Sequence, residues 1–165
     1  EVTAWVALSQ ASVESGCMRF VPASHTKEAA HADRPAKGAM LSRGQELIEA
    51  VDDSQAVNAP LLPGQMSLHH GLTFHASMPN RSDDRRIGFA IRYIKPSMRQ
   101  AGGERGVATL VQGEDRYQNF ELAPRPQSVA APEDIALWQQ AVSIQNQINY
   151  RDMKPPTDRG GALRT

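Results

Sequence analysis

The amino-acid sequence predicts a mainly β protein with one helix near its C-terminal end. Short runs rich in β-branched and aromatic residues recur along the first part of the chain, and turn-forming residues separate them. No helical pattern comes between these runs. Short strands joined by turns, without helices between them, are typical of a β-sandwich or a β-barrel.

The predicted strands follow one another closely. They cover residues 2–8, 17–21, 56–62, 65–70, 72–77 and 87–94. The pair Pro63 and Gly64 predicts a tight turn, because Pro fixes φ at the second position of a type II turn and Gly supplies the positive φ of the third. Polar turns are expected at residues 14–16 and 79–84.

Residues 25–46 do not show a strand pattern. The segment is polar and contains Pro35, Gly38 and Gly44. We therefore expect a long excursion loop with at most one helical turn. A loop of this length inside a compact domain is usually functional.

The closely spaced strand pattern of the sequence ends at about Pro96. Residues 107–111 form a possible short strand, and the Pro-rich residues 120–132 are expected to be extended. A helix is predicted at about residues 133–150, where acidic residues suit the positive end of the helix dipole. One face of this helix would carry Ile135, Trp138, Val142 and Ile148.

We accordingly divide the chain into a β core, residues 1–98, and a C-terminal extension, residues 99–165, within one domain. At 165 residues the chain is long enough for one domain with its own core.

Composition narrows the range of partners. The 18 basic and 18 acidic residues balance, so no basic excess favours nucleic acid. The longest apolar run, residues 87–94, contains Arg92 and is far shorter than the roughly 20 residues of a membrane span. Cys17 is the one cysteine, so no internal disulfide forms, which fits a cytoplasmic location. We expect a small-molecule substrate, and neither nucleic acid nor a membrane as partner.

The chain opens within a predicted strand, with no initiator Met and no signal-peptide pattern. Termini are usually loosely held surface segments. We therefore expect the chain to be part of a longer protein; the alternative is a short natural protein with a terminal edge strand. Strand edges left exposed by a missing segment would favour association between copies of the chain.

Two side chains carry the main chemical hypothesis. His75 ends one predicted strand, and Arg86 lies eleven positions later at the start of the next. Across an antiparallel pair joined by a short turn, both could point into one cavity. A neutral imidazole suits iron, and a guanidinium suits a carboxylate held by two hydrogen bonds. From spacing alone, a structural histidine is the commoner interpretation.

Four segments resemble the phytanoyl-CoA dioxygenase family. They are VTAWVALSQAS, ESGCMRFVPASH, PGQMSLHHGLTFHASMPNRSDDRRIGFAIRYI and LVQGEDRYQNF, in the family's order, over roughly residues 1–125. The resemblance implies an iron(II)- and 2-oxoglutarate-dependent dioxygenase. It also implies a jelly roll, the cupin-like double-stranded β-helix, here incomplete at its N-terminal end.

The resemblance assigns roles to single residues. His75 matches the second histidine of the iron site, and Arg86 the arginine that pairs with the far carboxylate of 2-oxoglutarate. Ser77 matches a hydroxyl that contacts this co-substrate, and Trp5 a tryptophan lining the same pocket. No catalytic residue beyond the iron site is implied.

Alternatives remain for these assignments. Trp5 could be a core residue, and Ser77 could satisfy a strand-end amide. Arg85 or Arg92 could hold the carboxylate instead of Arg86, although alternation puts Arg86 and Arg92 on one face.

The family's other iron ligands form a His-x-Asp pair before the tryptophan strand, and this chain does not contain that segment. His31 and Asp33 have the same spacing, but they follow the strand at residues 17–21 and lie in a polar loop. A loop holds metal ligands poorly, so we reject them as ligands. In the resembling family this loop borders the substrate mouth, so His31 is a candidate for the pocket wall.

The remaining histidines and the cysteine have simpler interpretations. His69 and His70 are adjacent on a strand and face opposite sides, so His69 is a second candidate for the pocket wall. His25 is expected at a strand end. Cys17 is most simply a small core residue.

Three functions stay open. The first is part of an active dioxygenase that hydroxylates a small organic substrate, with the chain inactive on its own; whether hydroxylation or halogenation results depends on the Asp outside the chain. The second is a non-catalytic jelly-roll binding module. The third is a cupin-type metal enzyme that uses His31, Asp33 and His75.

Overall fold

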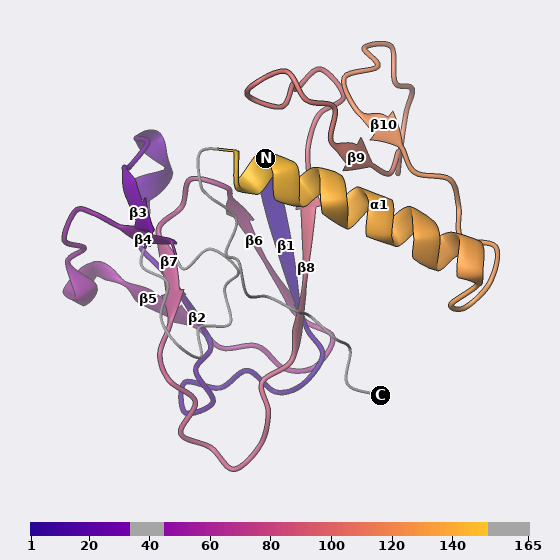
Figure 1. Ribbon diagram of the computed structural model, residues 1–165. Helices are drawn as coiled ribbons and strands as arrows, with labels where there is room; N and C mark the ends of the chain where they lie inside the picture. The colour runs from indigo at the N-terminus through magenta and orange to yellow at the C-terminus, as the bar shows by residue number, and fades with distance from the viewer. Residues whose placement is uncertain (34–44, 152–165) are drawn as a thin grey trace. The chain divides into compact units, whose positions relative to one another are not determined.

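The computed structural model describes residues 1–33 and 45–151. These residues form two compact units, Glu1–Ile94 and Lys95–Thr165. The first unit is built from β-strands and the second carries the helix (Figure 1). The boundary between the two units, after residue 94, lies close to Pro96, beyond which the closely spaced strand pattern of the sequence ends.

The first unit contains a three-stranded sheet centred on β1 (Val2–Ala7). β6 (Met66–His70) and β8 (Gly88–Tyr93) flank it, and both pairings are antiparallel. β-Branched and aromatic residues suit a central strand that packs on both faces. The predicted strands at residues 2–8, 65–70 and 87–94 are therefore confirmed, with slightly shorter bounds.

A second three-stranded sheet is centred on β2 (Met18–Phe20). β5 (Val57–Ala59) and β7 (His75–Ser77) pair with it in antiparallel fashion. The rings of Phe20 in β2 and His69 in β6 lie 4.9 Å apart. The two sheets therefore face each other at this point.

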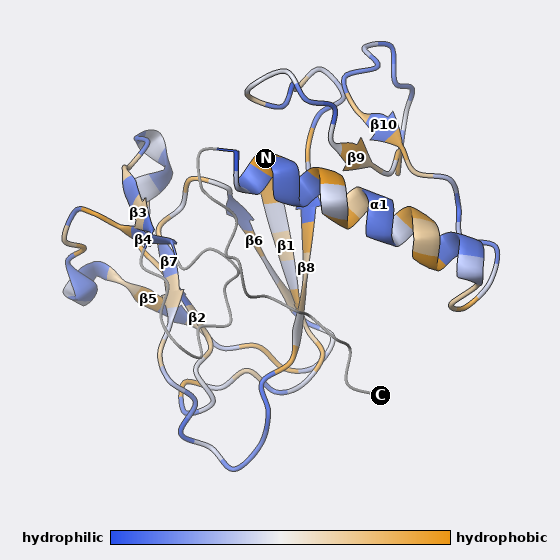
Figure 2. Ribbon diagram, in the orientation of Figure 1, coloured by the Kyte–Doolittle hydropathy of each residue, from blue (hydrophilic) through white to orange (hydrophobic). Residues whose placement is uncertain are grey.

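The expectation that His75 and Arg86 lie on paired strands is wrong. β7 pairs with β2 and β8 pairs with β1, so the chain crosses from one sheet to the other between them. A hairpin and a crossing use the same polar turn residues, and the sequence pattern does not distinguish them. The connecting segment is hydrophilic, as predicted for residues 79–84 (Figure 2).

The predicted loop at residues 25–46 contains regular structure. β3 (His31–Asp33) pairs with β4 (Gln45–Leu47), and a 3-10 turn covers Ser24–Thr26. These strands lack an apolar pattern, and backbone hydrogen bonds such as Ile48 N–H to Ala30 O, at 3.0 Å, hold them together. Pro35, Gly38 and Gly44, on which the loop prediction rested, lie outside the described residues.

The two faces of the β6-β1-β8 sheet differ in character. The outer face is apolar apart from His70 and carries Val2, Ala4, Val6, Met66, Leu68, His70, Phe89, Ile91 and Tyr93. The inner face, which meets the second sheet, carries Thr3, Trp5, Ala7, Ser67, His69, Gly88, Ala90 and Arg92. Thr3, Trp5, Ser67 and His69 thus lie on the face where the two sheets meet.

Small side chains form the buried core of the first unit. Ala7, Ala11 and Cys17 are buried, and Trp5 and Leu61 pack against them. The predicted role of Cys17 as a small core residue is confirmed. A 3-10 turn at Asp53–Gln55 precedes β5, and the carboxylate of Asp52 accepts a hydrogen bond from Ser54 N–H at 3.0 Å.

The predicted turn chemistry is confirmed at two glycines. Gly64 has φ +85°, and Gln65 N–H donates to Leu62 O at 3.0 Å, which closes the turn. Gly16 has φ +75°, and a Cβ there would overlap the carbonyl oxygen of Met78. Gly16 therefore lets the first polar turn approach the segment that follows β7.

The second unit contains the predicted helix, α1 (Pro132–Asn149), one residue displaced from its predicted bounds. Pro132 stands in its first turn, where the missing N–H costs nothing. β9 (Val107–Ala108) and β10 (Glu121–Leu122) form a short parallel pair. β9 confirms the strand predicted within residues 107–111. β10 lies within residues 120–132, which were expected to be extended without regular structure.

Hydrophobic and hydrophilic residues are interspersed along α1 (Figure 2). The predicted apolar face is only partly packed: Ile148 is half-buried, whereas Ile135, Trp138 and Val142 are exposed. Among the described residues, no helix has the length and apolarity to cross a membrane.

Gly16→Ala should destabilise the protein more than Gly64→Ala. Both residues have positive φ, which costs an L-residue about 1–2 kcal/mol. Only Gly16 also meets neighbouring backbone; nothing lies within 4 Å of a Cβ at Gly64. Overpacking should add a further ~1–3 kcal/mol at Gly16. Urea denaturation measures both variants, and equal losses of stability would contradict this account of Gly16.

Candidate functional site

A hydrogen bond to the backbone orients the imidazole ring of His75. Nδ1 lies 2.8 Å from the carbonyl oxygen of Thr73. A carbonyl only accepts, so Nδ1 carries the proton in this contact and the lone pair of the neutral ring is on Nε2. Metal-binding histidines are commonly oriented by such a bond to their other nitrogen. In this tautomer the Nε2 lone pair of His75 could serve as a metal ligand.

Three rings meet between the two sheets. The ring centroids of His69 and His75 are 5.2 Å apart, and those of Phe20 and His75 are 6.3 Å apart. With the contact between Phe20 and His69, the rings form a cluster to which β2, β6 and β7 each contribute one. The sequence prediction placed His69 in the pocket wall, and the structure places it beside His75.

Two polar atoms of β6 are buried here without a hydrogen-bond partner. They are His69 Nδ1 and Ser67 Oγ, both on the inner face. Desolvation, and secondly the neighbouring His75, lower the pKa of His69. The neutral ring is therefore favoured at neutral pH. Buried polar atoms without partners are uncommon and often mark a site where another molecule binds.

Arg86 lies over the ring of Trp5. Its guanidinium carbon is 5.3 Å from the ring centroid, within the range of a cation–π contact. The indole also packs against the buried core, so Trp5 contacts both the core and Arg86. Gly88 makes room for this ring, because a Cβ there would overlap the indole.

Ser9 fixes the backbone on both sides of Arg86. Its hydroxyl donates to Arg85 O at 2.9 Å and accepts from Ile87 N–H at 2.7 Å. Sequence reasoning missed this residue, because a serine just after a strand is common in any turn. The available signal was that Ser9 follows the strand of Trp5.

Arg92, one alternative to Arg86, lies at the other end of the sheet. It is in register with Thr3, whereas Gly88, next to Arg86, is in register with Ala7. Its side chain is 73% exposed, and Nε is 3.9 Å from a carboxylate oxygen of Glu1. Arg85 is exposed in the connecting segment. Of these three arginines, Arg86 is the one that lies over the Trp5 ring.

Ser77 lies two residues after His75 on the same side of β7. It is exposed, and its hydroxyl is 3.8 Å from the sulfur of Met18. His70 faces the opposite side from His69; its Nδ1 accepts from Leu72 N–H at 3.2 Å, and its ring lies 5.6 Å from that of His25. His25 lies in the 3-10 turn, not at a strand end.

The proposed triad of His31, Asp33 and His75 is not assembled. His31 and Asp33 are exposed on β3, in register with Leu47 and Gln45. Within residues 1–33 and 45–151, no three His, Cys, Asp or Glu side chains are grouped as a metal site. The cupin-type hypothesis therefore receives no support from the described part of the chain.

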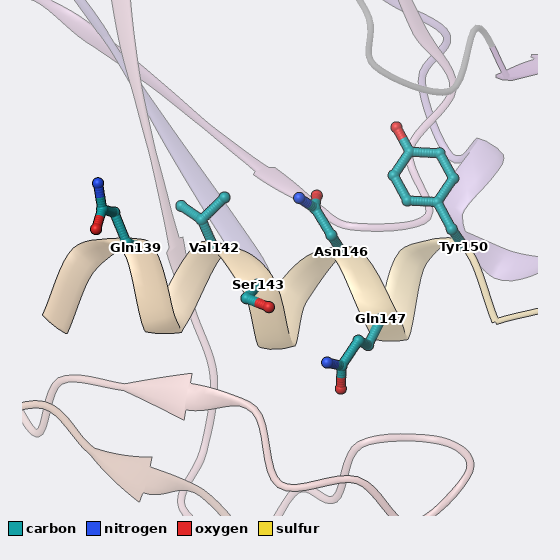
Figure 3. Close-up of a pocket in the computed structure, with 6 residues that line it drawn as sticks. All are labelled: Gln139, Val142, Ser143, Asn146, Gln147 and Tyr150. Carbon is teal, nitrogen blue, oxygen red and sulfur yellow. The ribbon is translucent and has the colours of Figure 1, made fainter. Parts of the chain in front are cut away.

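A separate hollow of about 470 Å³ lies along α1 in the second unit. Gln139, Val142, Asn146 and Tyr150 project on one side of the helix, with Ser143 and Gln147 completing the lining (Figure 3). None of the site residues predicted from the sequence lines it.

Comparison with known proteins identifies the family. The profile of "Phytanoyl-CoA dioxygenase (PhyH)" matches residues 1–88, more than half of the chain. The chain belongs to the phytanoyl-CoA dioxygenase family. This confirms the resemblance found in the sequence, and the matched region contains Trp5, His75 and Arg86.

Curated relatives in animals are similar to this chain. A "Phytanoyl-CoA dioxygenase domain-containing protein 1 homolog" of Caenorhabditis briggsae is 32% identical over 97 residues, or 55% of this chain and 33% of the relative. "Phytanoyl-CoA dioxygenase domain-containing protein 1" of Bos taurus is 34% identical over 95 residues, or 55% of this chain and 32% of the relative. The matched part is about a third of the length of these relatives.

Solved structures extend the similarity to both units. The structure "non-heme monooxygenase; ThoJ apo" has a TM-score of 0.75 and 34% identity, covering 90% of this chain and 53% of that chain. "Non-heme monooxygenase, ThoJ-Ni complex" has a TM-score of 0.73 and 30% identity, covering 91% and 51%.

Gly88→Ala should displace the Trp5 ring, because a Cβ and the indole cannot occupy the same space. We expect a loss of about 1–3 kcal/mol in unfolding free energy and a changed Trp5 fluorescence spectrum, recorded with Trp138→Phe. Gly71→Ala is the control, since a Cβ there meets only the flexible side chain of Glu1. An unchanged spectrum in Gly88→Ala would refute this packing.

Ser9→Ala should loosen the backbone around Arg86 by removing two hydrogen bonds. We expect a stability loss of about 1–2 kcal/mol and a shifted or broadened NMR signal of the Arg86 Nε–H. Ser9→Thr keeps the hydroxyl and should restore most of the signal. If the arginine signal is the same in Ser9→Ala and the unmodified chain, Ser9 does not position Arg86.

Proposed function

We propose that this chain is the C-terminal part of the jelly-roll core of an iron(II)- and 2-oxoglutarate-dependent dioxygenase. The proposal rests on one observation: two sheets meet, and the side chains they present include a potential metal ligand and a potential carboxylate-binding cation. β7 presents His75 with Nε2 available, and the facing sheet presents Arg86 over Trp5. The rings of His75 and His69 make a contact across the two sheets.

The residues fit one part of such a site. His75 would hold the iron, while Arg86 would bind the far carboxylate of 2-oxoglutarate with Trp5 and Ser77 beside it. A guanidinium held against an indole is restricted in its motion, which favours two-pronged binding of a carboxylate. Iron(II), when bound, supplies the oxygen-activating chemistry. The other ligands are expected from a His-x-Asp segment outside the 165 residues.

Membership of the phytanoyl-CoA dioxygenase family and the likeness to a non-heme monooxygenase support an oxygenase. We infer hydroxylation of a small organic molecule as the reaction of the whole protein. The jelly roll is supported by the two facing antiparallel sheets. β7 and β8 each have one unpaired edge among the described strands, which supports association between copies as a further proposal.

A non-catalytic binding module is the second candidate. It is favoured by His69 Nδ1 and Ser67 Oγ, which are buried without a hydrogen-bond partner and could bind a ligand without a metal. Such a module would bind a ligand through these groups without oxygenase activity. Binding of 2-oxoglutarate to Arg86 distinguishes a co-substrate site from a site for some other ligand.

Arg86→Ala should weaken binding of 2-oxoglutarate at least about tenfold, because a charge-assisted pair contributes about 1.5–3 kcal/mol. Titration of the 165-residue chain, followed by the NMR signal of the Trp5 indole N–H, measures the affinity. Arg92→Ala is the matched control and should change it less than about twofold.

Three results would contradict the assignment. If Arg92→Ala rather than Arg86→Ala loses binding, Arg92 holds the carboxylate. If both variants bind as the unmodified chain does, neither arginine holds it. If 2-oxoglutarate leaves the Trp5 signal unchanged at millimolar concentration, this chain does not form the co-substrate site.

A further inference from the structure

We propose that Ser24 is a positioning residue for His75, to which it is linked through a single peptide group. This group joins Thr73 to Phe74. Its N–H donates to Ser24 Oγ at 2.8 Å, and its C=O lies 2.8 Å from Nδ1 of His75. Ser24 therefore acts on the imidazole from outside the β7 strand, although Phe74 lies 50 residues after it in the sequence.

The hydroxyl of Ser24 takes the place of one backbone hydrogen bond between the segments of β2 and β7. Just beyond β2, Val21 N–H donates to Phe74 O at 3.0 Å. In a regular antiparallel pair the reciprocal bond would run from Phe74 N–H to Val21 O. Here Phe74 N–H donates to Ser24 Oγ, and the hydroxyl in turn donates to Val21 O at 2.8 Å. The serine thus bridges the two segments directly beside His75.

The backbone before Ser24 brings the hydroxyl to this place. Ala23 has a φ of +60°, in the left-handed region that residues other than glycine rarely adopt. The 3-10 turn Ser24–Thr26 starts there, and Ser24 N–H lies 3.4 Å from Val21 O. Ser24 is only 9% exposed, so water competes little for the hydroxyl. Its donor and its acceptor are both used within the protein.

A fixed peptide group fixes the tautomer of His75. The peptide bond is planar, so holding its N–H also fixes the direction of its C=O. A carbonyl only accepts, so Thr73 O keeps the imidazole proton on Nδ1 and the lone pair on Nε2. Hydrogen bonds in such a chain also strengthen one another. Without the Ser24 hydroxyl, Phe74 N–H would turn toward Val21 O, and the opposite carbonyl would turn away from the ring.

The purpose of this link rests on the proposed function, in which Nε2 of His75 is the ligand atom for iron. Metal-binding histidines are commonly oriented by a hydrogen bond to their other nitrogen, which fixes the tautomer. The link itself is a property of the protein without metal. It is therefore tested on the metal-free chain, by a measurement that does not involve activity.

Long-range ¹H–¹⁵N NMR of the metal-free 165-residue chain, at about pH 8.5 where imidazoles are neutral, distinguishes the two tautomers of each histidine. In the unmodified chain His75 should be mainly the Nδ1–H form. Ser24→Ala should lower its ratio of Nδ1–H to Nε2–H about two- to tenfold, the factor that one net hydrogen bond provides. Ser24→Thr keeps the hydroxyl and should restore the ratio.

Two controls come from the same chain. Thr26→Val removes a different hydroxyl bond of the same 3-10 turn, from Thr26 to Ala23 O at 3.1 Å, and should leave the His75 ratio unchanged. His70 is the reference within each spectrum, because its Nδ1 accepts from Leu72 N–H and should stay unprotonated in every variant. An unchanged His75 ratio in Ser24→Ala, or an equal change in Thr26→Val, would overturn the proposal.

A measurement on the unmodified chain does not depend on how the variants fold. The amide proton of Phe74 should show a nuclear Overhauser effect to the β protons of Ser24, because the nitrogen and the hydroxyl oxygen are 2.8 Å apart. Absence of this effect, or a His75 ring that is mainly the Nε2–H form, would show that the link does not exist in solution.

The outcomes separate this inference from the proposed function. If Ser24→Ala changes the His75 tautomer while Arg86→Ala binds 2-oxoglutarate normally, the positioning role stands and the co-substrate assignment falls. If Ser24→Ala leaves the tautomer unchanged while Arg86→Ala loses 2-oxoglutarate, the positioning role falls and the co-substrate assignment stands.

Discussion

The hydrogen-bond ladder on both edges of β1 determines the arrangement of the site. Its register pairs Thr3 with His69, and Trp5 with Ser67 and Ala90. Because side chains alternate between the faces of a strand, a shift of one residue would turn His69 and Trp5 away from the second sheet. The apolar outer face and the polar inner face both follow from this register.

Between β7 and β8 the chain crosses from one sheet to the other, so the candidate residues come from both sheets. If the two strands formed a hairpin, His75 and Arg86 would belong to one sheet, with nothing opposite them. Because the chain changes sheets, His75 lies in the second sheet, and Arg86 lies just before β8 of the first sheet, against Trp5. Trp5 and Ser9 then hold Arg86 in its place, one through its ring and one through backbone hydrogen bonds.

Much of the local structure could be predicted from the sequence. The central strand around Trp5, the turn at Gly64 and the helix that starts near Pro132 each depend on residues that are adjacent in the chain. Family resemblance supplied His75, Arg86, Ser77 and Trp5 as candidates, and their roles stay predictions. Periodicity alone would have supplied only a histidine and an arginine near strand ends.

What could not be predicted depends on pairing between distant segments. Which sheet β8 joins is decided by its ladder with β1, and the polar turn before it fits either choice. The pairing of His31–Asp33 with Gln45–Leu47 has no apolar pattern to reveal it. The proximity of His69 to His75 likewise follows from two sheets facing each other, which adjacent residues do not encode.

The alternation along β6 has a practical consequence for engineering. Met66 and Leu68 point outward and are 57% and 66% exposed, whereas Ser67 and His69 point toward the other sheet. Mutant libraries at the even-numbered positions should therefore alter solubility, and libraries at the odd-numbered positions should alter chemistry. Within five consecutive residues, the two properties can be optimised independently.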